Sequence, residues 1–336
     1  MQSDDGTAGT PAPTPSGDGT TADVGRAAPP ESDAFAAHRA ALRGVVAIPV
    51  TPFDADGGVD WGRHAALLDR MVGAGVRTVT PNGNTGEFYA LEPAEARRAT
   101  ENTVKELGSR AAIVVGVGLD TSSAIAAARH AHDAGAQMVM VHQPVHPYVS
   151  GEGWIEYHRR IAEAVPELGV VLYIRDPRID GGQLARLGEL CPNVIGVKYS
   201  VPDPVRFAAV AMDAGPGRFS WVAGLAELSA PGYFALGATG FTSGLVNVAP
   251  EISLEFHRRL AAGDYAGARD IWALMRPFEE LRAADGSADN VSVVKEALAQ
   301  LGLCRADVRP PSRALPRTVR DHVEAILASW GERWTI

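Results

Sequence analysis

The chain alternates short apolar runs with helical patterns eight times, and this alternation restricts the fold more than any other feature of the sequence. The runs are rich in β-branched residues and carry no polar face, as expected of parallel strands buried on both sides. They lie at 44–50, 76–80, 112–117, 137–141, 169–173, 193–200, 219–222 and 238–242. The helical patterns after them begin near Asp60, Glu92, Thr121 or Ser122, Trp154, Gln183, Asp203, Glu227 and Pro250.

Eight strand-then-helix units with short connections predict an α/β protein, a (βα)8 TIM barrel over residues 39–262. A doubly wound open sheet is the alternative. Three further helical patterns, at about 265–281, 290–301 and 315–330, follow the last unit. A barrel does not need them, so they predict a C-terminal helical extension over residues 263–336 that serves contacts between subunits.

Residues 1–38 have a different composition, with few large apolar residues and much Pro, Gly, Thr and Asp. Such a segment cannot offset the entropy of ordering, so we expect a disordered N-terminal tail. Its six acidic residues against Arg26 contribute −5 of the formal charge of −9. The remaining charge is small, which argues against a nucleic-acid partner.

Neither a membrane nor a secretory pathway is indicated. No apolar run approaches the roughly 18 residues of a membrane span. The N-terminus has neither the basic region nor the apolar core of a signal peptide. Cys191 and Cys304 fit no disulfide or zinc spacing, and reduced thiols are the default in the cytosol. We therefore expect a cytoplasmic protein.

Lysine is rare in this chain. Of 31 basic residues only Lys105, Lys198 and Lys295 are lysines. Lys198 lies at the carboxyl end of the apolar run 193–200, where a barrel places its chemistry. Burial there would lower the pKa of the amine and make it a nucleophile. The alternative is a lysine that extends from a strand end into water. Lys295 lies in a helical pattern and is expected on a solvated or interface face.

A barrel would bring the polar residues and glycines that follow its strands to one mouth. Those residues are Thr51, Asn82 to Glu87, Gly116, Gly118, His142, Gln143, Tyr173, Arg175, Lys198, Gly224, Thr242 and Ser243. In the turn from Gly83 to Glu87, backbone N–H groups and the Thr85 hydroxyl could hold a carboxylate. An ordinary loop between strand and helix is the alternative.

Three side chains near Lys198 have candidate roles. Tyr173 ends the preceding strand, so its phenol could exchange protons with an imine on Lys198; packing in the core is the alternative. Arg175 and Arg178 could bind a second carboxylate, although a surface position is the favoured interpretation of either arginine.

Metal and dinucleotide sites are not indicated. His142, His146 and His158 lie close in sequence, but no carboxylate is placed as a third ligand. Gly116-Val117-Gly118 lacks the third glycine and the acidic residue of a dinucleotide fingerprint. We expect neither a metal nor a cofactor.

Several of these motifs together resemble those of the dihydrodipicolinate synthase / N-acetylneuraminate lyase superfamily of class I Schiff-base aldolases. They are Pro49-Val50-Thr51-Pro52-Phe53, Gly83-Asn84-Thr85-Gly86-Glu87, the strand-end Tyr173 and Gly196-Val197-Lys198. The resemblance runs from about Val45 to Leu303. It implies a (βα)8 barrel with a helical extension, a lysine imine with pyruvate or another 2-oxo acid, no metal or cofactor, and a homo-oligomer, tetramer or dimer.

The resemblance also implies roles for individual residues. Lys198 would be the imine lysine, and Tyr173 and Thr85 would complete the catalytic set. Asn84-Thr85 stands where the family has the Thr-Thr pair that holds the 2-oxo acid carboxylate. Arg178 stands where the synthases keep a substrate-binding arginine. The substrate-binding set expected for this chain is Asn84, Gly86, Arg175, Arg178 and Thr242.

Two features depart from the synthases. Asn84 replaces their first threonine, and the loop from Gln143 to Tyr148 lacks the tyrosine pair that extends their proton relay. Other segments resemble the branch that contains 5-dehydro-4-deoxyglucarate dehydratase. They are Tyr173-Ile174-Arg175-Asp176, Gly86-Glu87-Phe88 and Cys191-Pro192-Asn193, although that branch has Asn in place of Ile174 and Asp-Gly in place of Tyr199-Ser200.

The sequence thus predicts a class I lyase or aldolase that acts on pyruvate or another 2-oxo acid, with cleavage or formation of a carbon–carbon bond. The first alternative is a decarboxylating sugar-acid dehydratase of the 5-dehydro-4-deoxyglucarate type. A second is a barrel that binds a small acid without catalysis, and a third is a metal-dependent aldolase.

Overall fold

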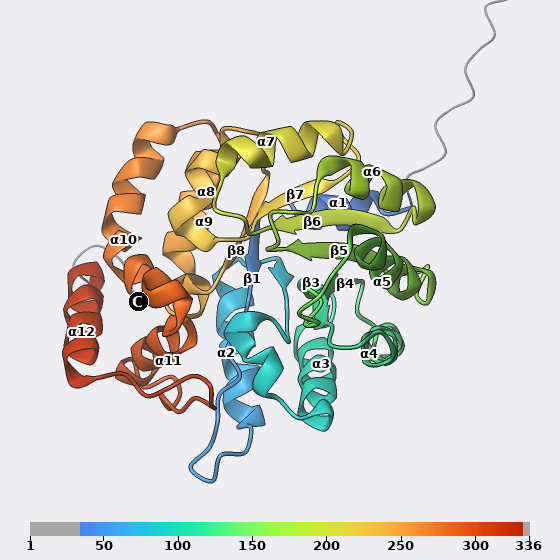
Figure 1. Cartoon of the computed structure of the whole chain (residues 1–336). Coiled ribbons are helices and arrows are strands. Elements are labelled where there is room, and N and C mark those ends of the chain that lie inside the picture. Colours follow the sequence, from blue (N-terminus) through green and yellow to red (C-terminus); the bar gives the residue numbers. More distant parts are fainter. Residues whose placement is uncertain (1–33, 332–336) are drawn as a thin grey trace, which may run out of the picture. The chain divides into compact units, whose positions relative to one another are not determined.

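Residues 34–331 are described by a computed structural model; residues 1–33 and 332–336 lie outside the described range. Eight parallel strands pair in sequence order, and the last pairs with the first, which closes the barrel (Figure 1). The strands are β1 (Val45–Ala47), β2 (Thr78–Val79), β3 (Ala112–Val117), β4 (Met138–Val141), β5 (Gly169–Ile174), β6 (Val194–Tyr199), β7 (Ser220–Ala223) and β8 (Gly240–Ser243). The predicted TIM barrel is confirmed, and the open sheet is excluded.

Helices surround this barrel and continue beyond it (Figure 1). The α-helices are α1 (Ala36–Ala41), α2 (Trp61–Ala74), α3 (Pro93–Leu107), α4 (Thr121–Ala134), α5 (Gly151–Glu163), α6 (Gly181–Leu190), α7 (Pro204–Asp213), α8 (Ala226–Phe234), α9 (Pro250–Ala261), α10 (Tyr265–Ser287), α11 (Asn290–Gln300) and α12 (Arg317–Gly331). The 3-10 turns are η1 (Asn84–Gly86), η2 (Phe88–Ala90) and η3 (Leu245–Asn247).

Side-chain caps explain where several helices begin. Asp60 caps α2 by accepting a hydrogen bond from the backbone N–H of Arg63, as the sequence predicted. The cap of α4 is Asp120, which bonds the N–H of Ser123, and not Thr121 or Ser122. The prediction failed there because any of these three residues can cap a helix, and the backbone of Asp120 is the one that is extended.

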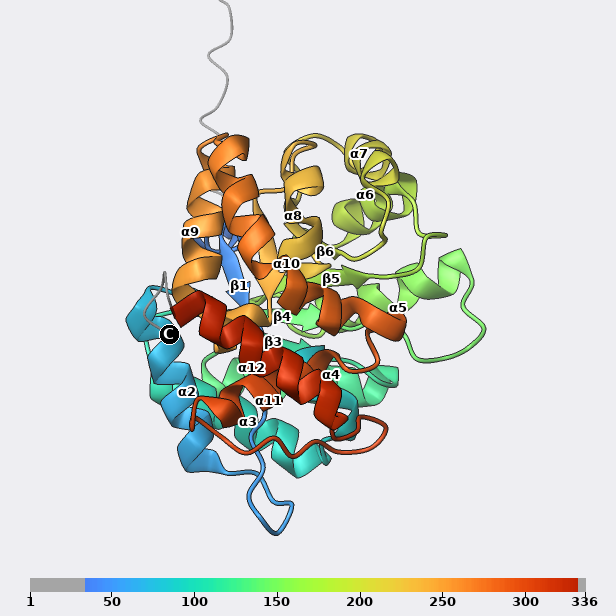
Figure 2. The same ribbon diagram turned by 90° about the vertical axis from the view of Figure 1, so that its left-hand side faces the viewer.

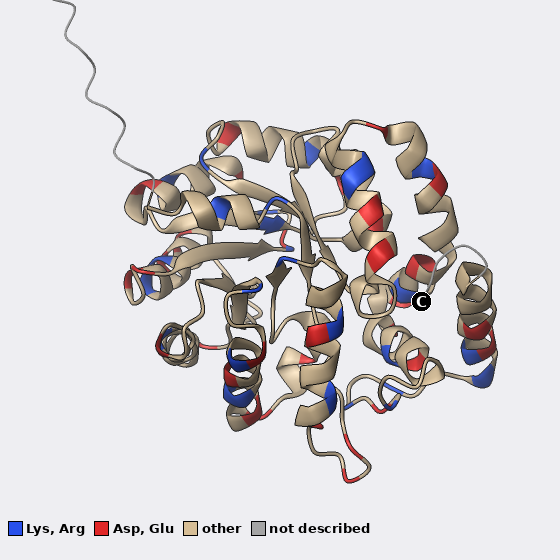
Figure 3. Ribbon diagram, turned by 180° about the vertical axis from the view of Figure 1, so that it is seen from behind, with Lys and Arg blue, Asp and Glu red and all other residues tan. Residues whose placement is uncertain are grey.

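The apolar core has two layers. Inward-facing residues such as Val114, Met140 and Val222 fill the barrel, and a larger cluster lies between the strands and the surrounding helices. Figure 3 shows that charged residues lie mainly on the helices and loops, while the strands carry few. A sheet buried on both faces has little room for solvated charge.

Helix α1 closes the amino end of the barrel and was not predicted; it includes residues 36–38, which the sequence placed in the tail. The Arg39 guanidinium donates hydrogen bonds to the carbonyl oxygens of Ile195 and Arg218 at 3.1 and 2.5 Å. Leu42 is 1% exposed and packs with the residues inside the barrel. Burial of one leucine stabilises the fold by about 2 kcal/mol. The backbone of Leu42 also lies so close to β8 that a Cβ on Gly240 would be 2.3 Å from the Leu42 carbonyl oxygen.

The pairing of β5 with β6 contains a bulge. Val170 pairs with Val194, but the next residue, Val171, pairs with Gly196, so β6 carries one extra residue. Beyond the bulge the register is regular, and Tyr173 pairs with Lys198.

The C-terminal extension consists of α10, α11 and α12, which lie against one side of the barrel (Figure 2). Helix α10 is interrupted at residues 284–286, where the backbone leaves the helical region. The helices match the predicted segments closely. Within residues 34–331, no helix has the length and apolar character needed to span a bilayer.

Candidate active site

Lys198 and Tyr173 lie side by side at the carboxyl end of the barrel. They are register partners on β6 and β5, and neighbours in register on parallel strands point to the same face. Both are 5% exposed, and the Lys198 Nζ lies 4.2 Å from the centroid of the Tyr173 ring. The structure therefore brings together the two side chains that the sequence predicted as a pair.

The Lys198 amine is held in conditions that favour its neutral form. Burial lowers its pKa from 10.5 to about 7, and repulsion from the Arg175 guanidinium adds to this effect. No carboxylate in residues 34–331 forms an ion pair with it to offset these two causes. Roughly half of the amines are therefore unprotonated at pH 7 and carry a lone pair.

The Tyr173 phenol is buried and protonated at neutral pH. Burial raises the pKa of Tyr173, while the charge of Arg175 and the nearby polar groups of Ser200 and Asn84 lower it. The Asn84 side-chain amide donates to the phenol oxygen at 3.2 Å. Because the phenol oxygen accepts this bond, its own hydrogen remains available for a donor role elsewhere.

The turn that carries Asn84 packs tightly against the end of β1. A Cβ on Gly83 would lie 2.5 Å from Ile48, and one on Gly86 would lie 2.9 Å from the Pro49 carbonyl oxygen. The Thr51 hydroxyl donates to the Gly86 carbonyl at 2.8 Å. These contacts explain both glycines: the backbone approaches its neighbour too closely for a side chain.

Aromatic side chains form one wall of the mouth. The buried His142 ring stacks on Phe88, with centroids 4.3 Å apart, and meets the Tyr173 ring edge-on at 5.9 Å. Its Nε2 lies 2.9 Å from the Asn82 carbonyl oxygen. Burial lowers the pKa of His142 to about 3, so the ring is neutral. The sequence placed His142 at the mouth but gave it no role in binding or catalysis.

A cavity of about 400 Å³ opens toward solvent beside Tyr173, and Lys198 is not among its lining residues. Its lining residues are Asn84, Tyr89, Gln143, Pro144, Val145, Tyr173, Arg175 and Asp176. Several buried polar atoms at the mouth have no hydrogen-bond partner within the described residues: Asn84 Oδ1, His142 Nδ1, Gln143 Oε1 and Ser200 Oγ. Because buried polar atoms are nearly always paired in proteins, this group of unpaired atoms indicates a place for a polar ligand or water.

Not all predicted site residues meet at the cavity. Thr85 and Gly86 are buried in the turn, and Arg175 lines the cavity. Arg178 does not: its side chain is 68% exposed and forms an ion pair with Asp176 at 2.6 Å. Thr242 is buried on β8, two strands from Lys198, and does not line the cavity.

The sequence reasoning gave no role to Ser200, Tyr89 or Gln143. For Ser200 a signal existed, because alternation along a strand places it on the same face as Lys198. Its Oγ would lie 2.0 Å from a Cβ on Gly224, which shows how closely β6 and β7 approach there. Tyr89 lies in the short 3-10 turn η2 and Gln143 lies on a loop, and neither segment is long enough to carry a sequence period.

The three histidines considered as metal ligands do not gather. His158 is buried in α5, where its Nδ1 contacts the Trp154 carbonyl oxygen, and His146 is exposed. In the part of the chain that is described, no group of three His, Cys, Asp or Glu side chains could hold a metal ion. Cys191 and Cys304 are free.

Comparison with known proteins gives a consistent result. Residues 41–329 match the sequence model of the "Dihydrodipicolinate synthetase family". A "Probable 5-dehydro-4-deoxyglucarate dehydratase 1" from Streptomyces avermitilis is 33% identical over 87% of this chain and 94% of its own. A "4-hydroxy-tetrahydrodipicolinate synthase" from Phenylobacterium zucineum is 34% identical over 86% and 98%. The crystal structure of a dihydrodipicolinate synthase from Bacillus clausii superposes with a TM-score of 0.85, at 38% identity, over 88% of this chain and 99% of its own.

Proposed function

Because this chain belongs to the dihydrodipicolinate synthetase family and is a lyase of that family, we propose that it binds a 2-oxo acid covalently as an imine on Lys198. The observation that carries the proposal is the buried pair on β5 and β6. An amine with a pKa of about 7 lies 4.2 Å from the centroid of a protonated phenol ring, without a carboxylate partner in the described residues.

The proposed reaction begins with the neutral amine. The Lys198 lone pair attacks the ketone carbon, and the carbonyl oxygen takes up a proton to give a carbinolamine. A second proton, supplied by the phenol, converts that hydroxyl to water, whose loss leaves a protonated imine; the phenolate regains its proton from water. Tyr173 delivers the first proton and accepts one in return, because its phenol hydrogen is not committed to Asn84. Asn84 and the turn that ends at Glu87 hold the substrate carboxylate, with backbone N–H groups as donors.

The imine is what makes lysine necessary. Its positive nitrogen withdraws the electron pair that a broken carbon–carbon or carbon–hydrogen bond leaves on the neighbouring carbon, giving a neutral enamine. Arginine cannot replace lysine here, because its guanidinium stays protonated. Neither a metal nor a cofactor takes part in this proposal; hydrolysis of the final imine returns the amine.

Borohydride trapping tests the proposal. Reduction converts the imine to a stable secondary amine, so each candidate 2-oxo acid adds its own mass to the chain. We expect pyruvate, 2-oxobutyrate or a sugar-derived 2-oxo acid to label one site, located at Lys198 by peptide mapping. Absence of an adduct with all of these acids would remove the basis of the proposal.

A decarboxylating dehydratase of the 5-dehydro-4-deoxyglucarate type is the second candidate. The outer cavity favours a substrate with hydroxyl groups and a second acid group, because it combines the Arg175 guanidinium with unpaired acceptors on Gln143 and Asn84. The name of the Streptomyces relative points the same way. A synthase reaction is less well supported, because the Asn84 amide cannot relay protons as a threonine hydroxyl does. Release of carbon dioxide from 5-dehydro-4-deoxyglucarate would support the dehydratase, and its absence would count against it.

Two further alternatives have simple tests. A barrel that binds an acid without catalysis would show a ligand-induced rise in melting temperature but no adduct and no turnover. A metal-dependent aldolase would lose activity on treatment with a chelator. We also propose a homo-oligomer, tetramer or dimer, to be measured by analytical ultracentrifugation. A cytoplasmic location stays a prediction from the sequence.

A further inference from the structure

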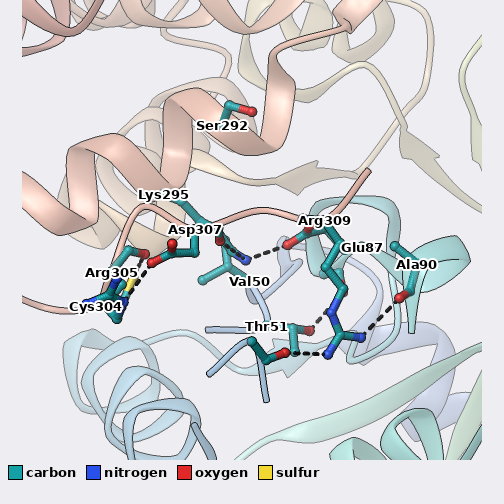
Figure 4. A network of polar contacts seen from close by, with 12 residues as sticks. Val50, Thr51, Glu87, Ala90, Ser292, Lys295, Cys304, Arg305, Asp307 and Arg309 are labelled. Atoms are coloured by element: carbon teal, nitrogen blue, oxygen red, sulfur yellow. Dashed lines mark hydrogen bonds and ion pairs between the residues drawn. The ribbon is translucent and has the colours of Figure 1, made fainter. Parts of the chain in front are cut away.

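Lys295 of the C-terminal extension is a fully buried lysine held by two oxygen acceptors and an aromatic ring. Its Nζ contacts Glu87 Oε2 at 2.5 Å and donates to the Asp307 carbonyl oxygen at 2.8 Å (Figure 4). It also lies 3.8 Å from the centroid of the Phe53 ring, whose face attracts cations. An ammonium group has three N–H donors, and three acceptors surround this one.

Glu87 is held on both of its carboxylate oxygens by the extension. Its Oε2 accepts a hydrogen bond from the Lys295 ammonium group, and its Oε1 accepts one from the backbone N–H of Arg309 at 2.8 Å. The Glu87 carboxylate is therefore fixed by two groups more than 200 positions later in the sequence. A buried carboxylate held in this way cannot change its orientation without leaving a charge unpaired.

The backbone of Glu87 closes the turn that carries Asn84 and Thr85. Its N–H donates to the Asn84 carbonyl oxygen at 3.0 Å. Its φ is +58°, in the left-handed region that residues other than glycine seldom adopt. Such a conformation persists only where surrounding contacts hold it. For Glu87 the extension supplies the side-chain contacts, in addition to backbone hydrogen bonds with Asn84 and Ala90.

Arg309 adds a second connection between the same two parts of the molecule. Its guanidinium forms a two-pronged ion pair with Glu95 near the start of α3, at 2.5 and 2.7 Å. It also donates to the carbonyl oxygen of Ala90 (Figure 4) and to that of Gly57. The segment around Arg309 therefore contacts the loop after β2 and the start of α3 at several points besides Glu87.

We propose that Lys295 is a positioning residue for the carboxylate-binding turn: through Glu87 it fixes Asn84 and Thr85 in the arrangement that holds the 2-oxo acid for attack by Lys198. This inference rests on the proposed function. Lys295 does not touch substrate, so its loss acts on binding of the acid more than on the chemistry at the amine. The C-terminal extension then forms part of the binding apparatus.

The test compares Lys295→Met with the parent protein, using pyruvate and borohydride. We expect the pyruvate concentration for half-maximal labelling of Lys198 to rise about 10- to 100-fold, because small displacements of positioning groups have effects of this size. The labelling rate at saturating pyruvate should stay within about threefold. An unchanged half-maximal concentration would overturn the inference while the proposed function stands.

A matched control separates positioning from a general loss of stability. Glu279→Gln breaks another buried ion pair of the extension, between Glu279 and Arg282, whose side chains are 3 and 4% exposed. Neither of these residues contacts the turn in the structure. We expect this variant to melt earlier but to keep the parent's half-maximal pyruvate concentration; a rise equal to that of Lys295→Met would also overturn the inference.

Hydrogen exchange tests the inference even if no adduct forms in any variant. Amides of residues 83–88 should exchange about tenfold faster in Lys295→Met than in the parent, because the contacts that hold the turn are lost. Should this variant fail to fold, Glu87→Gln/Lys295→Met leaves no buried charge and serves instead. It should exchange at an intermediate rate, since a glutamine oxygen still accepts from the Arg309 N–H. Parent-like exchange in the variant measured would overturn the inference.

Discussion

The two buried lysines have nearly the same exposure but opposite electrostatic surroundings. Lys198 has no carboxylate partner in the described residues, and its pKa falls to about 7. Lys295 is also desolvated, which lowers its pKa, but the Glu87 carboxylate opposes that effect at 2.5 Å. Burial alone therefore does not decide what a lysine does. A paired amine stabilises the structure as a cation, and an unpaired amine becomes neutral and reactive.

Replacement of the unpaired lysine should have the largest effect. Lys198→Arg keeps the positive charge but cannot form an imine, so we expect turnover to fall at least about 10⁴-fold, the scale seen when a covalent nucleophile is removed. Intact mass after borohydride treatment should show no adduct, and circular dichroism should match the parent. Substantial turnover or a remaining adduct would mean that another amine does the chemistry.

Replacement of the paired lysine should lower stability in addition to weakening binding of the acid. Lys295→Met leaves the Glu87 carboxylate buried without its partner, and such a change typically costs about 3–5 kcal/mol of unfolding free energy. Lys105→Met is the control, because Lys105 is exposed on α3 and should change stability by less than about 0.5 kcal/mol. Denaturant unfolding of both variants measures the difference, and equal effects would refute the comparison.

Removal of the unpaired amine of Lys198 should increase the free energy of unfolding, whereas removal of the Lys295 amine should decrease it. Lys198→Met eliminates a cation that is buried without a partner, so we expect the variant to be about 1–4 kcal/mol more stable than the parent at pH 7. The folded-state pKa of Lys198 is below its ordinary value, so the unfolded chain binds more protons. The parent therefore gains stability relative to Lys198→Met as pH rises from about 7 to 10.5. Unfolding curves across this window measure the gain; a constant difference would contradict the lowered pKa.

The smallest expected effect is a shift in the pH dependence of Lys198 labelling when the Arg175 guanidinium is removed. Imine formation should increase with pH below about 7 and level off above it, because the neutral amine is the nucleophile. In Arg175→Met the repulsive charge is gone, so the pKa of Lys198 should rise and the inflection should move to higher pH. Arg186→Met is the control: this exposed residue pairs with Glu152 on the outside of the barrel. The pH profile of labelling measures the shift, and an unmoved inflection in Arg175→Met would count against a role for Arg175.

Much of the fold and the central pair could be predicted because both depend on local or periodic signals. Strands and helices alternate along the chain, and Lys198 and Tyr173 each end an apolar run, so a barrel must bring them to one mouth. Helix α1 was missed because a six-residue helix carries little periodic signal. The position of α1 against the barrel depends on contacts of Leu42 and Arg39 with residues far along the chain, which no local pattern reveals.

Lys295 shows where sequence reasoning failed, and Arg178 is a predicted site residue that lies outside the cavity. Lys295 follows a helical pattern and was predicted on a solvated or interface face, but the structure buries it against Glu87, 208 positions earlier. No local pattern reveals a partner so distant. Arg178 was predicted to bind substrate, but Asp176 lies two residues before it and pairs with it outside the cavity. Substrate binding by Arg178 stays a prediction.

The bulge in β6 separates the two ends of that strand. Ile195 and Gly196 take up the extra residue below, so the half that fills the barrel and the half that presents Lys198 follow different phases of alternation. Ile195 and Lys198 are three positions apart, and on a regular strand such residues point to opposite faces. The extra residue therefore lets Ile195 fill the interior while Lys198 still lies beside Tyr173.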